Sequence, residues 1–308
     1  MLRILEPGRI EAFAQRAIPR LQLPDRAQVF SQRARRLRKL GDSGAIGHAI
    51  GEYLRLMAAL ADAQQASLAS FKATAPDAGQ IAHARAFGLP PLHVMSRPRD
   101  KHWRDLLQAL CDSMAALPDL PASARDVCNR VRHCEPAWIE QQADVLLAAR
   151  TTEVDIALAP FLMAALQVCW VDLASQLTCD DAAEVDVQGV CPMCGTLPVA
   201  SVVRTNQRSQ GHRYLHCALC ATEWHMVRVT CSQCQSTRGI TYQSIEGGPD
   251  AIRAECCEEC RSYRKIFYQE KDPEVEPVAD DLASLALDLL LGEAGYRRSS
   301  GNPLLWQA

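Results

Sequence analysis

Two stretches of cysteine pairs decide the fold of the second half of the chain. The first contains Cys191-Pro192-Met193-Cys194 and Cys217-Ala218-Leu219-Cys220, and the second contains Cys231-Ser232-Gln233-Cys234 and Cys257-Glu258-Glu259-Cys260. In each stretch, 22 residues separate one Cys-x-x-Cys pair from the next. Adding 40 to each of the first four cysteine numbers gives the second four, so one pattern occurs twice. Thiols in such closely spaced pairs are typical of metal sites.

Each copy spans only about 40 residues, which is too few to fold on the burial of apolar side chains alone. A tetrahedral thiolate site supplies the missing stability, because structural zinc contributes about 10–16 kcal/mol in small fingers. The two-residue spacer lets both sulfurs reach one ion while backbone N–H groups turn toward them. Gly195 suits the positive φ of such a turn, whereas Ala221, Gln235 and Arg261 follow the other pairs.

Two ligand assignments fit this spacing. In a cross-braced assignment, alternate pairs share an ion. In a modular assignment, which the 40-residue repeat favours, each copy holds its own ion. The two modular sets are Cys191, Cys194, Cys217 and Cys220, and Cys231, Cys234, Cys257 and Cys260. Four sulfurs leave no open position for catalysis by the metal, and such sites suit iron and zinc alike.

The first half of the chain predicts a different architecture, an all-α helical domain over residues 1–182. Apolar residues recur at helical spacing in five segments: 25–37, 51–66, 102–116, 137–150 and 160–177. The metal modules are expected over 183–229 and 230–272. A C-terminal helix and a tail that docks on the body are expected over 273–308. The fold class is therefore α plus small β metal modules.

The composition and the distribution of apolar residues restrict the compartment and the classes of function that fit this chain. The chain has 308 residues, 48% apolar content and a formal charge of −3, which argues against a broad basic surface for duplex DNA. Arg3 and Glu6 interrupt the amino terminus, so no signal peptide is expected. The longest uncharged apolar stretch, 156–171, contains Pro160 and is too short to span a bilayer. We expect a cytoplasmic protein, in which clustered thiols act as metal ligands rather than disulfides.

The remaining cysteines and the histidines near the first copy receive structural roles. We interpret the scattered thiols as buried and inert, since free cysteine behaves as a small apolar residue; they are Cys111, Cys128, Cys134, Cys169 and Cys179. Each copy already offers four sulfurs, so the histidines are assigned to hydrogen bonding or to the surface. These are His212, His216 and His225. Cys256, beside Cys257, has no cysteine counterpart in the first copy.

Two groups of basic residues suggest partners. A run on the first predicted helix indicates a solvated face, with an acidic patch of a client protein as the alternative; it consists of Arg33, Arg35, Arg36, Arg38 and Lys39. An acid-free stretch in the first copy suggests nucleic acid as a less favoured partner; it holds Arg204, Arg208 and Arg213. Tyr214 and Trp224 are expected to pack in a small core rather than stack on bases.

Several motifs together resemble the FdhE family of formate dehydrogenase accessory proteins. They include Cys191-Pro-Met-Cys-Gly195, the run from Tyr214 to Val229, Tyr268-Gln-Glu-Lys-Asp-Pro273, Gly295-Tyr-Arg-Arg-Ser-Ser300 and Pro98-Arg-Asp-Lys-His-Trp103. The resemblance extends over nearly the whole chain. It implies a cytoplasmic factor, not itself an enzyme, that is needed for active respiratory formate dehydrogenase. It further implies association with the molybdopterin-containing catalytic subunit before twin-arginine export.

The resemblance also implies two rubredoxin-like modules that bind iron, although the ligand set alone leaves zinc as the alternative. Two other functions stay open at this stage. One is a rubredoxin-like electron-transfer protein that acts on the client. The other, less favoured, is a zinc-ribbon nucleic-acid-binding protein. A homodimer is compatible with the sequence, which does not itself indicate an oligomeric state.

Overall fold

The long helix α8 (Ala159–Ser175) runs through the helical half, and all its side chains from Ala159 to Ala174 are buried. A helix that is apolar all round belongs in a core. Its one charged residue, Asp172, accepts hydrogen bonds from the Ala73 N–H (2.7 Å) and from the Gln176 amide (2.8 Å). The computed structural model describes residues 18–306 except 45–46, 151–152, 184–188 and 206–208, so Arg3, Glu6 and Arg208 lie outside the described residues.

Six further helices make up the described part of the N-terminal half, and α3, α5 and α7 pack directly on α8. Their bounds are α2 (Val29–Asp42), α3 (His48–Ser70), α4 (Ala78–Ala86), α5 (Trp103–Ala115), α6 (Ala122–Val131) and α7 (Pro136–Leu147). None of the described helices combines the length and the apolar character that crossing a membrane requires. Periodicity predicted α2, α3, α5, α7 and α8, but not α4 or α6.

The two helices missing from the prediction were missed for different reasons: α4 lacks an apolar stripe, whereas α6 buries Ala124, Cys128 and Val131 at helical spacing. In α4 only Ala84 is buried, so no apolar stripe exists, and a capping box between Asp77 and Gln80 starts the helix. Pro121 was expected to end a helix but instead precedes the first turn of α6. A proline fits that position because the first N–H groups of a helix have no partner within it.

The strands form one continuous sheet in the order β1-β4-β3-β2-β7-β6-β5, and β8 pairs with β7. Their bounds are β1 (Leu21–Gln22), β2 (Pro198–Val203), β3 (Arg213–Cys217), β4 (Glu223–His225), β5 (Ile240–Gln243), β6 (Ile252–Cys257), β7 (Ser262–Tyr268) and β8 (Arg297–Arg298). The first copy supplies β2, β3 and β4, and the second supplies β5, β6 and β7. Parallel pairing of β2 with β7, from Ser201↔Ile266 to Val203↔Tyr268, joins the copies.

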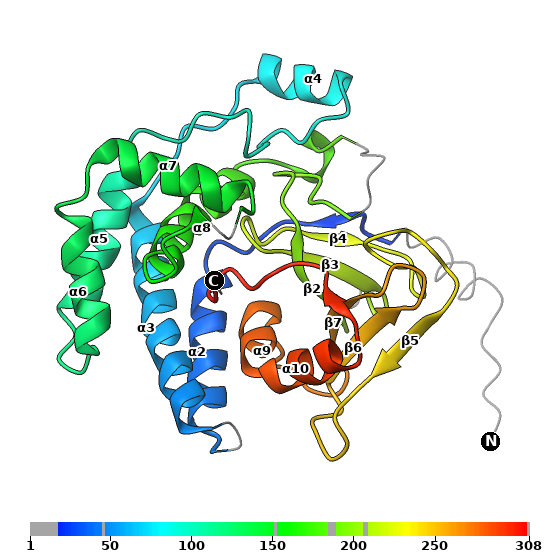
Figure 1. Cartoon of the computed structure of the whole chain (residues 1–308). Coiled ribbons are helices and arrows are strands. Elements are labelled where there is room, and N and C mark those ends of the chain that lie inside the picture. The colour runs from blue at the N-terminus through cyan, green and yellow to red at the C-terminus, as the bar shows by residue number, and fades with distance from the viewer. Residues whose placement is uncertain (1–17, 45–46, 151–152, 184–188, 206–208, 307–308) are drawn as a thin grey trace, which may run out of the picture.

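Two features of this sheet differ from the sequence expectation. The copies are not self-contained units, because β2 and β7 share one ladder. The expected all-α region also contributes a strand, since Leu21 pairs with Trp224 at the edge of the sheet. A two-residue strand carries too little alternation to be recognised from sequence. In Figure 1 the N-terminal helices other than α4 lie on one side of the molecule and the sheet on the other, with α9 and α10 between them.

The C-terminal helical segment is divided at Ser284 into α9 (Pro277–Ala283) and α10 (Leu285–Glu293). Lys265 on β7 explains the division, because its buried ammonium donates to the carbonyl oxygens of Asp281 (2.7 Å) and Ser284 (3.2 Å). Such bonds take carbonyl oxygens away from a continuous helix. On α10, Leu289 is 71% exposed.

Two of the basic residues on α2 are buried, which corrects the predicted solvated face. The Arg36 guanidinium clamps Asp280 of α9 through Nε, at 3.1 and 3.0 Å from the two carboxylate oxygens. Arg33 Nε donates to Glu276 at 3.1 Å. The expectation failed because these acids lie 243 and 244 positions further along the chain, beyond any local pattern. Arg35 remains exposed, and Lys39 forms an exposed pair with Glu274.

We expect Arg36→Met to lower the free energy of unfolding by about 3–5 kcal/mol, because it leaves Asp280 buried without its cation. Arg35→Met, one residue away on the exposed face, should change it by no more than about 0.5 kcal/mol. Urea unfolding followed by circular dichroism measures both. Equal effects of the two substitutions would show that the buried pair does not hold α2 to α9.

Candidate metal centres

The four thiols of the first copy converge at one end of the sheet. Cys191 and Cys194 lie in a turn before β2, Cys217 ends β3, and Cys220 lies in the turn that follows. All four are buried, and their sulfur atoms lie within 4.8 Å of one another. The Cys191 and Cys220 sulfurs are 3.6 Å apart, and those of Cys194 and Cys217 are 3.4 Å apart. We call this set the first cage.

The thiols of the second copy form a matching set, the second cage, also within 4.8 Å of one another. The Cys231 and Cys260 sulfurs are 3.7 Å apart, as are those of Cys234 and Cys257. This cage lies nearer the surface, because Cys234 is exposed and Cys260 is partly exposed. The sulfurs thus group within each copy, in the arrangement of the modular assignment rather than the cross-braced one.

Both cages have the dimensions of a tetrahedral metal site. With metal–sulfur bonds of about 2.3 Å, neighbouring sulfurs lie about 3.8 Å apart, close to the spacings seen here. Disulfides need about 2.05 Å and do not fit. In the first cage, burial and then hydrogen bonds from the other thiols raise the pKa of Cys191 well above its ordinary value. Four thiolates gathered in a buried site need a cation to balance their charge, and the donor set accepts iron or zinc.

All four Cys-x-x-Cys turns share one backbone geometry. The residue after the second cysteine has a positive φ in each: Gly195 (80°), Ala221 (56°), Gln235 (61°) and Arg261 (53°). For a side chain other than glycine this conformation costs about 1–2 kcal/mol. Three non-glycine residues adopt it at equivalent positions, so the geometry of the turn prevails over local preference. The sequence predicted it only at the glycine.

The same geometry directs backbone donors at sulfur. In the first cage the Leu219 and Cys220 N–H groups lie 3.4 and 3.3 Å from the Cys217 sulfur. In the second cage the Gln233 and Cys234 N–H groups lie 3.4 and 3.5 Å from the Cys231 sulfur. Such donors disperse the negative charge of a thiolate and hold it in place for a metal.

Hydroxyl groups complete this environment, and sequence reasoning missed them. Two positions after each second cysteine stands a serine or threonine: Thr196, Thr222, Ser236 and Ser262. The Thr196 hydroxyl lies 3.1 Å from the Cys194 sulfur, and the Ser262 hydroxyl lies 2.9 Å from the Cys260 sulfur. The Thr222 hydroxyl lies 3.2 Å from the Cys220 sulfur, whereas the Ser236 hydroxyl donates to the Arg238 carbonyl at 3.4 Å. Their fixed place in the repeat is the signal that would have found them.

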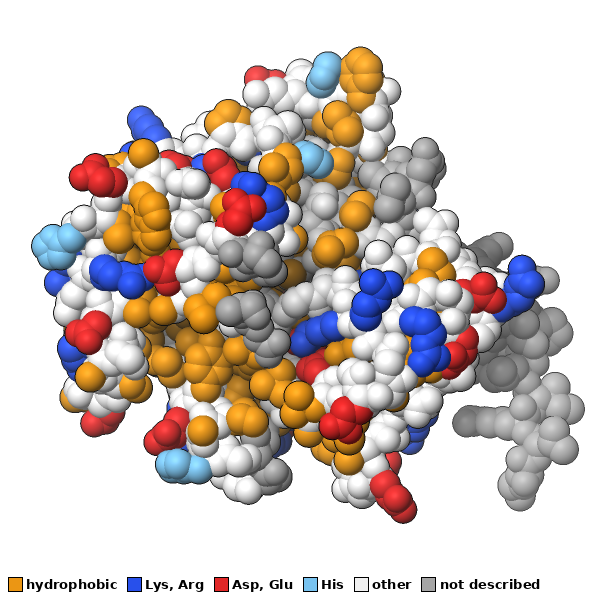
Figure 2. Space-filling model, in the orientation of Figure 1, with side chains coloured by type: hydrophobic (Ala, Val, Ile, Leu, Met, Phe, Trp, Pro, Cys, Tyr) orange, Lys and Arg blue, Asp and Glu red, His pale blue; other side chains and the backbone are white. Residues whose placement is uncertain are grey.

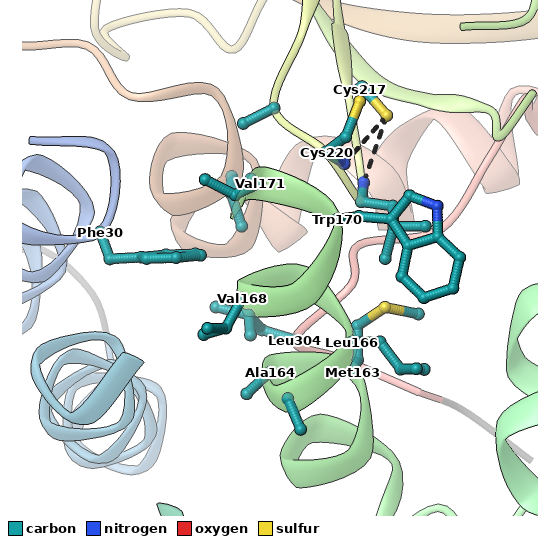
Figure 3. Close-up of a cluster of buried hydrophobic side chains, with 14 of the residues drawn as sticks. Phe30, Met163, Ala164, Leu166, Val168, Trp170, Val171, Cys217, Cys220 and Leu304 are labelled. Carbon is teal, nitrogen blue, oxygen red and sulfur yellow. Dashed lines mark hydrogen bonds between the residues drawn. The ribbon is translucent and has the colours of Figure 1, made fainter. Parts of the chain in front are cut away.

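The helical half holds the first cage in place. The Leu92 N–H donates to the Met193 carbonyl (2.8 Å) and the Val94 N–H to the Cys194 carbonyl (3.1 Å). From α8, the Gln167 side chain donates to the Ala218 carbonyl at 2.7 Å. Figure 3 shows α8 running directly up to the turn that carries Cys217 and Cys220. The first cage is therefore anchored to the most buried helix of the molecule.

The second cage is held by the C-terminal segment instead. Arg261 in its last turn donates to the Ala294 carbonyl (2.9 Å), and the Arg297 N–H donates to the Arg261 carbonyl (2.8 Å). Cys256 does not belong to this cage. It is buried in a separate apolar cluster with Tyr263 and Leu287, on the opposite face of β6 from Cys257.

The other predicted residues occupy varied environments. Cys111, Cys128 and Cys169 are buried as expected, Cys134 is partly exposed, and Cys179 is exposed. Tyr214 and Trp224 are buried, as the packing interpretation predicted.

The charged residues of the first copy are paired inside the protein. His216 lies 2.9 Å from Glu223, which also pairs with Arg204, while Arg213 is buried against Glu255. Arg204 and Arg213 come from a stretch of sequence without acidic residues, but in the fold each pairs with a glutamate of another strand. They therefore do not form an exposed basic cluster.

Known protein families match successive segments of this chain. Three family models match in succession: FdhE N-terminal on residues 18–186, FdhE central domain on 190–228 and FdhE C-terminal domain on 229–305. The chain belongs to the FdhE family. An FdhE homolog of Edwardsiella ictaluri is 45% identical over 93% of this chain and 91% of its own length. The FdhE protein of Salmonella choleraesuis is 40% identical over 98% of this chain and 96% of its own.

A solved structure shares the fold of this FdhE-family protein. The crystal structure of the FdhE protein from Pseudomonas aeruginosa superposes with a TM-score of 0.83 at 38% sequence identity. It covers 93% of this chain and 99% of the other. The family resemblance noted in the sequence is therefore confirmed over nearly the whole length.

We expect metal to leave the two cages at different rates, because only the second has exposed sulfur ligands. Purified protein treated with excess chelator should lose two equivalents in two phases. A Cys234→Ala, Cys260→Ala variant should lack the fast phase and keep the slow one. Release followed with a colorimetric metal indicator checks this, and a single phase for both ions would contradict it.

We expect Gly195→Ala to destabilise the first cage, since its φ of 80° and a new Cβ 2.8 Å from the His93 ring both oppose a side chain. The loss should be about 1–3 kcal/mol. Gln235→Gly, at the matching place in the second cage, removes strain and should change stability by less than about 1 kcal/mol. Thermal unfolding of the metal-loaded proteins measures both, and a harmless Gly195→Ala would contradict the strain and the His93 contact expected at this position.

Proposed function

We propose that the protein is a cytoplasmic maturation factor that binds the catalytic subunit of respiratory formate dehydrogenase before its twin-arginine export. Membership of the FdhE family supports an accessory role toward formate dehydrogenase. The observation that carries the proposal is the closed form of both cages. Each offers four sulfurs and leaves no coordination position for a substrate or an activated water. Such a protein acts by binding its client, not by catalysing a reaction.

We further propose that the eight cysteines of the two cages hold two iron ions, with zinc as the alternative. When bound, either ion supplies the positive charge that the thiolates need. An iron ion also supplies a one-electron couple. The chain itself supplies the rest of each site: N–H groups and hydroxyls directed at sulfur, and backbone turns already set for tetrahedral ligation.

An exposed apolar surface supports a protein client. The segment 78–97, which we call the α4 arm, projects from the body in Figure 1 and carries apolar side chains on its surface in Figure 2. Phe87 is 67% exposed, Met95 60% and Leu89 45%. Grouped exposed apolar residues are typical of protein–protein contacts. The arm also contacts the first cage through Leu92 and Val94, so we propose that it meets the catalytic subunit.

Electron transfer to the client is the second candidate, and the exposure of the second cage favours it. An ion held by Cys234 and Cys260 would lie close to the surface, within reach of a docked partner. A reversible one-electron change in the iron-loaded protein would support this function. Loss of the iron on reduction would exclude it and leave the binding role.

Capture of the client tests the maturation role. Immobilised wild-type protein should retain the formate dehydrogenase catalytic subunit from cytoplasmic extract of cells that make it. Phe87→Ser with Met95→Ser should reduce the retained amount at least about tenfold, because the contact loses its apolar side chains. Leu289→Ser removes an equally exposed leucine from α10 and should retain as much as wild type. Failure of the wild type to retain the subunit would contradict the proposed function.

A further inference from the structure

A buried cluster of charged side chains, with more positive than negative charge, lies next to the second cage. It consists of Arg213 on β3, Glu255 on β6 and Arg264 on β7, each less than 10% exposed. Arg213 Nη2 lies 2.7 Å from a Glu255 carboxylate oxygen, so these two charges neutralise each other. Arg264 is left as the unbalanced cation. An uncompensated buried charge is costly, so its presence requires an explanation.

Arg264 has only neutral partners for its hydrogen bonds. Its Nε donates to the Ser232 hydroxyl (2.8 Å), and its Nη1 donates to the Ser300 hydroxyl (2.7 Å) and to the Pro198 carbonyl. Its Nη2 has no hydrogen-bond partner among the described residues. Burial, and next the repulsion from Arg213, lower the pKa of Arg264 to about 9. Glu255 lies opposite Arg264 on the neighbouring strand and attracts it, but that carboxylate is shared with Arg213. Arg264 is thus a buried guanidinium without a carboxylate of its own.

Acids further away do not supply that anion. Asp281 and Asp288 are the nearest carboxylates of the C-terminal segment, and both pair with Lys265 and Arg298. Those four residues carry two positive and two negative charges and are balanced among themselves. The excess charge of Arg264 therefore remains.

The second cage and this cation line the same small cavity. The cavity has a volume of about 10 Å³, room for about one water molecule, and is lined by Arg213, Arg264, Cys231 and Cys257. Ser232, which accepts from Arg264, follows Cys231 directly in the chain. Four thiolates around a divalent ion carry a net charge of −2, and around a ferric ion −1. The cage can thus provide the missing negative charge.

The surroundings of the first cage differ. Beside Cys217, the charged residues Arg204 and Glu223 pair with each other at 2.9 Å, with His216 bonded to the same carboxylate. Positive and negative charges are matched there. The two cages are alike in ligands and unlike in the charge around them.

We propose that Arg264, supported by Arg213, is the built-in countercharge of the second cage and stabilises the more negative state of its ion. The inference rests on the proposed metal occupancy. In an iron-loaded protein the step is Fe³⁺ plus one electron to Fe²⁺, with no change of ligand or proton. The added negative charge lies next to Arg264, so the second iron accepts the electron more readily than it would without this residue. The same attraction strengthens metal binding in the second cage.

The test uses the full chain loaded with iron and titrated with dithionite under redox mediators, followed by visible absorption. Arg264→Met should lower the midpoint potential of the second iron and leave that of the first unchanged. Arg264→Lys, which keeps the charge, should restore most of the wild-type value. Glu255→Gln removes a negative charge and should raise the midpoint potential of the second iron. The Cys234→Ala, Cys260→Ala variant, which holds only the first iron, assigns the two signals.

A parallel measurement needs no redox-active metal. With cobalt in both cages, Arg264→Met should release the second cobalt at about tenfold lower chelator concentration, with the first unaffected. Arg253→Met, an exposed arginine on β6, is the matched control and should change nothing. If Arg264→Met does not fold, Glu255→Gln carries the test through the sign of its shift, with Arg264→Lys as the charge-conserving control.

The inference is overturned if the folded, metal-loaded variants leave the second site unchanged, or if both sites shift equally. A wild-type protein that takes up no metal overturns the occupancy on which the inference rests. Metal analysis of the wild type reports that outcome separately from any effect of Arg264.

Discussion

The repulsion and desolvation of four thiolates brought within 4.8 Å of one another is the constraint on which the sheet half of this molecule depends. A bound cation offsets both costs, and it explains why the turns that carry these thiols keep a positive φ at Ala221, Gln235 and Arg261 despite the strain. With a cation, each cage joins the ends of neighbouring strands. Metal binding then stabilises small β units that cannot fold on apolar burial alone.

The two cages are joined and yet set in different surroundings. Parallel pairing of β2 with β7 makes one sheet of both copies. The first is buried against α8 and the α4 arm, whereas the second opens to the surface and has Arg264 behind it. This arrangement suits a protein that docks through a fixed body and keeps one metal site accessible to its client.

Much of this architecture follows from local sequence, and the exceptions share a cause. Thiol spacing located both cages, and apolar periodicity located α2, α3, α5, α7 and α8. Contacts between distant segments were out of reach, which is why Arg33 and Arg36 were assigned to a solvated face although their acids lie over 240 positions away. The short strand β1 and the helix α4 carry too few buried residues to leave a pattern. The serines and threonines beside the sulfurs were visible in the repeat, and only their chemical role was missed.

X-ray absorption at the metal edge of the intact protein, purified without oxygen and quantified for metal, tests the central claim most directly. The account predicts two ions per chain, each surrounded by four sulfur atoms at about 2.3 Å. Oxygen or nitrogen neighbours in place of sulfur, or a fully folded protein without metal, would contradict it.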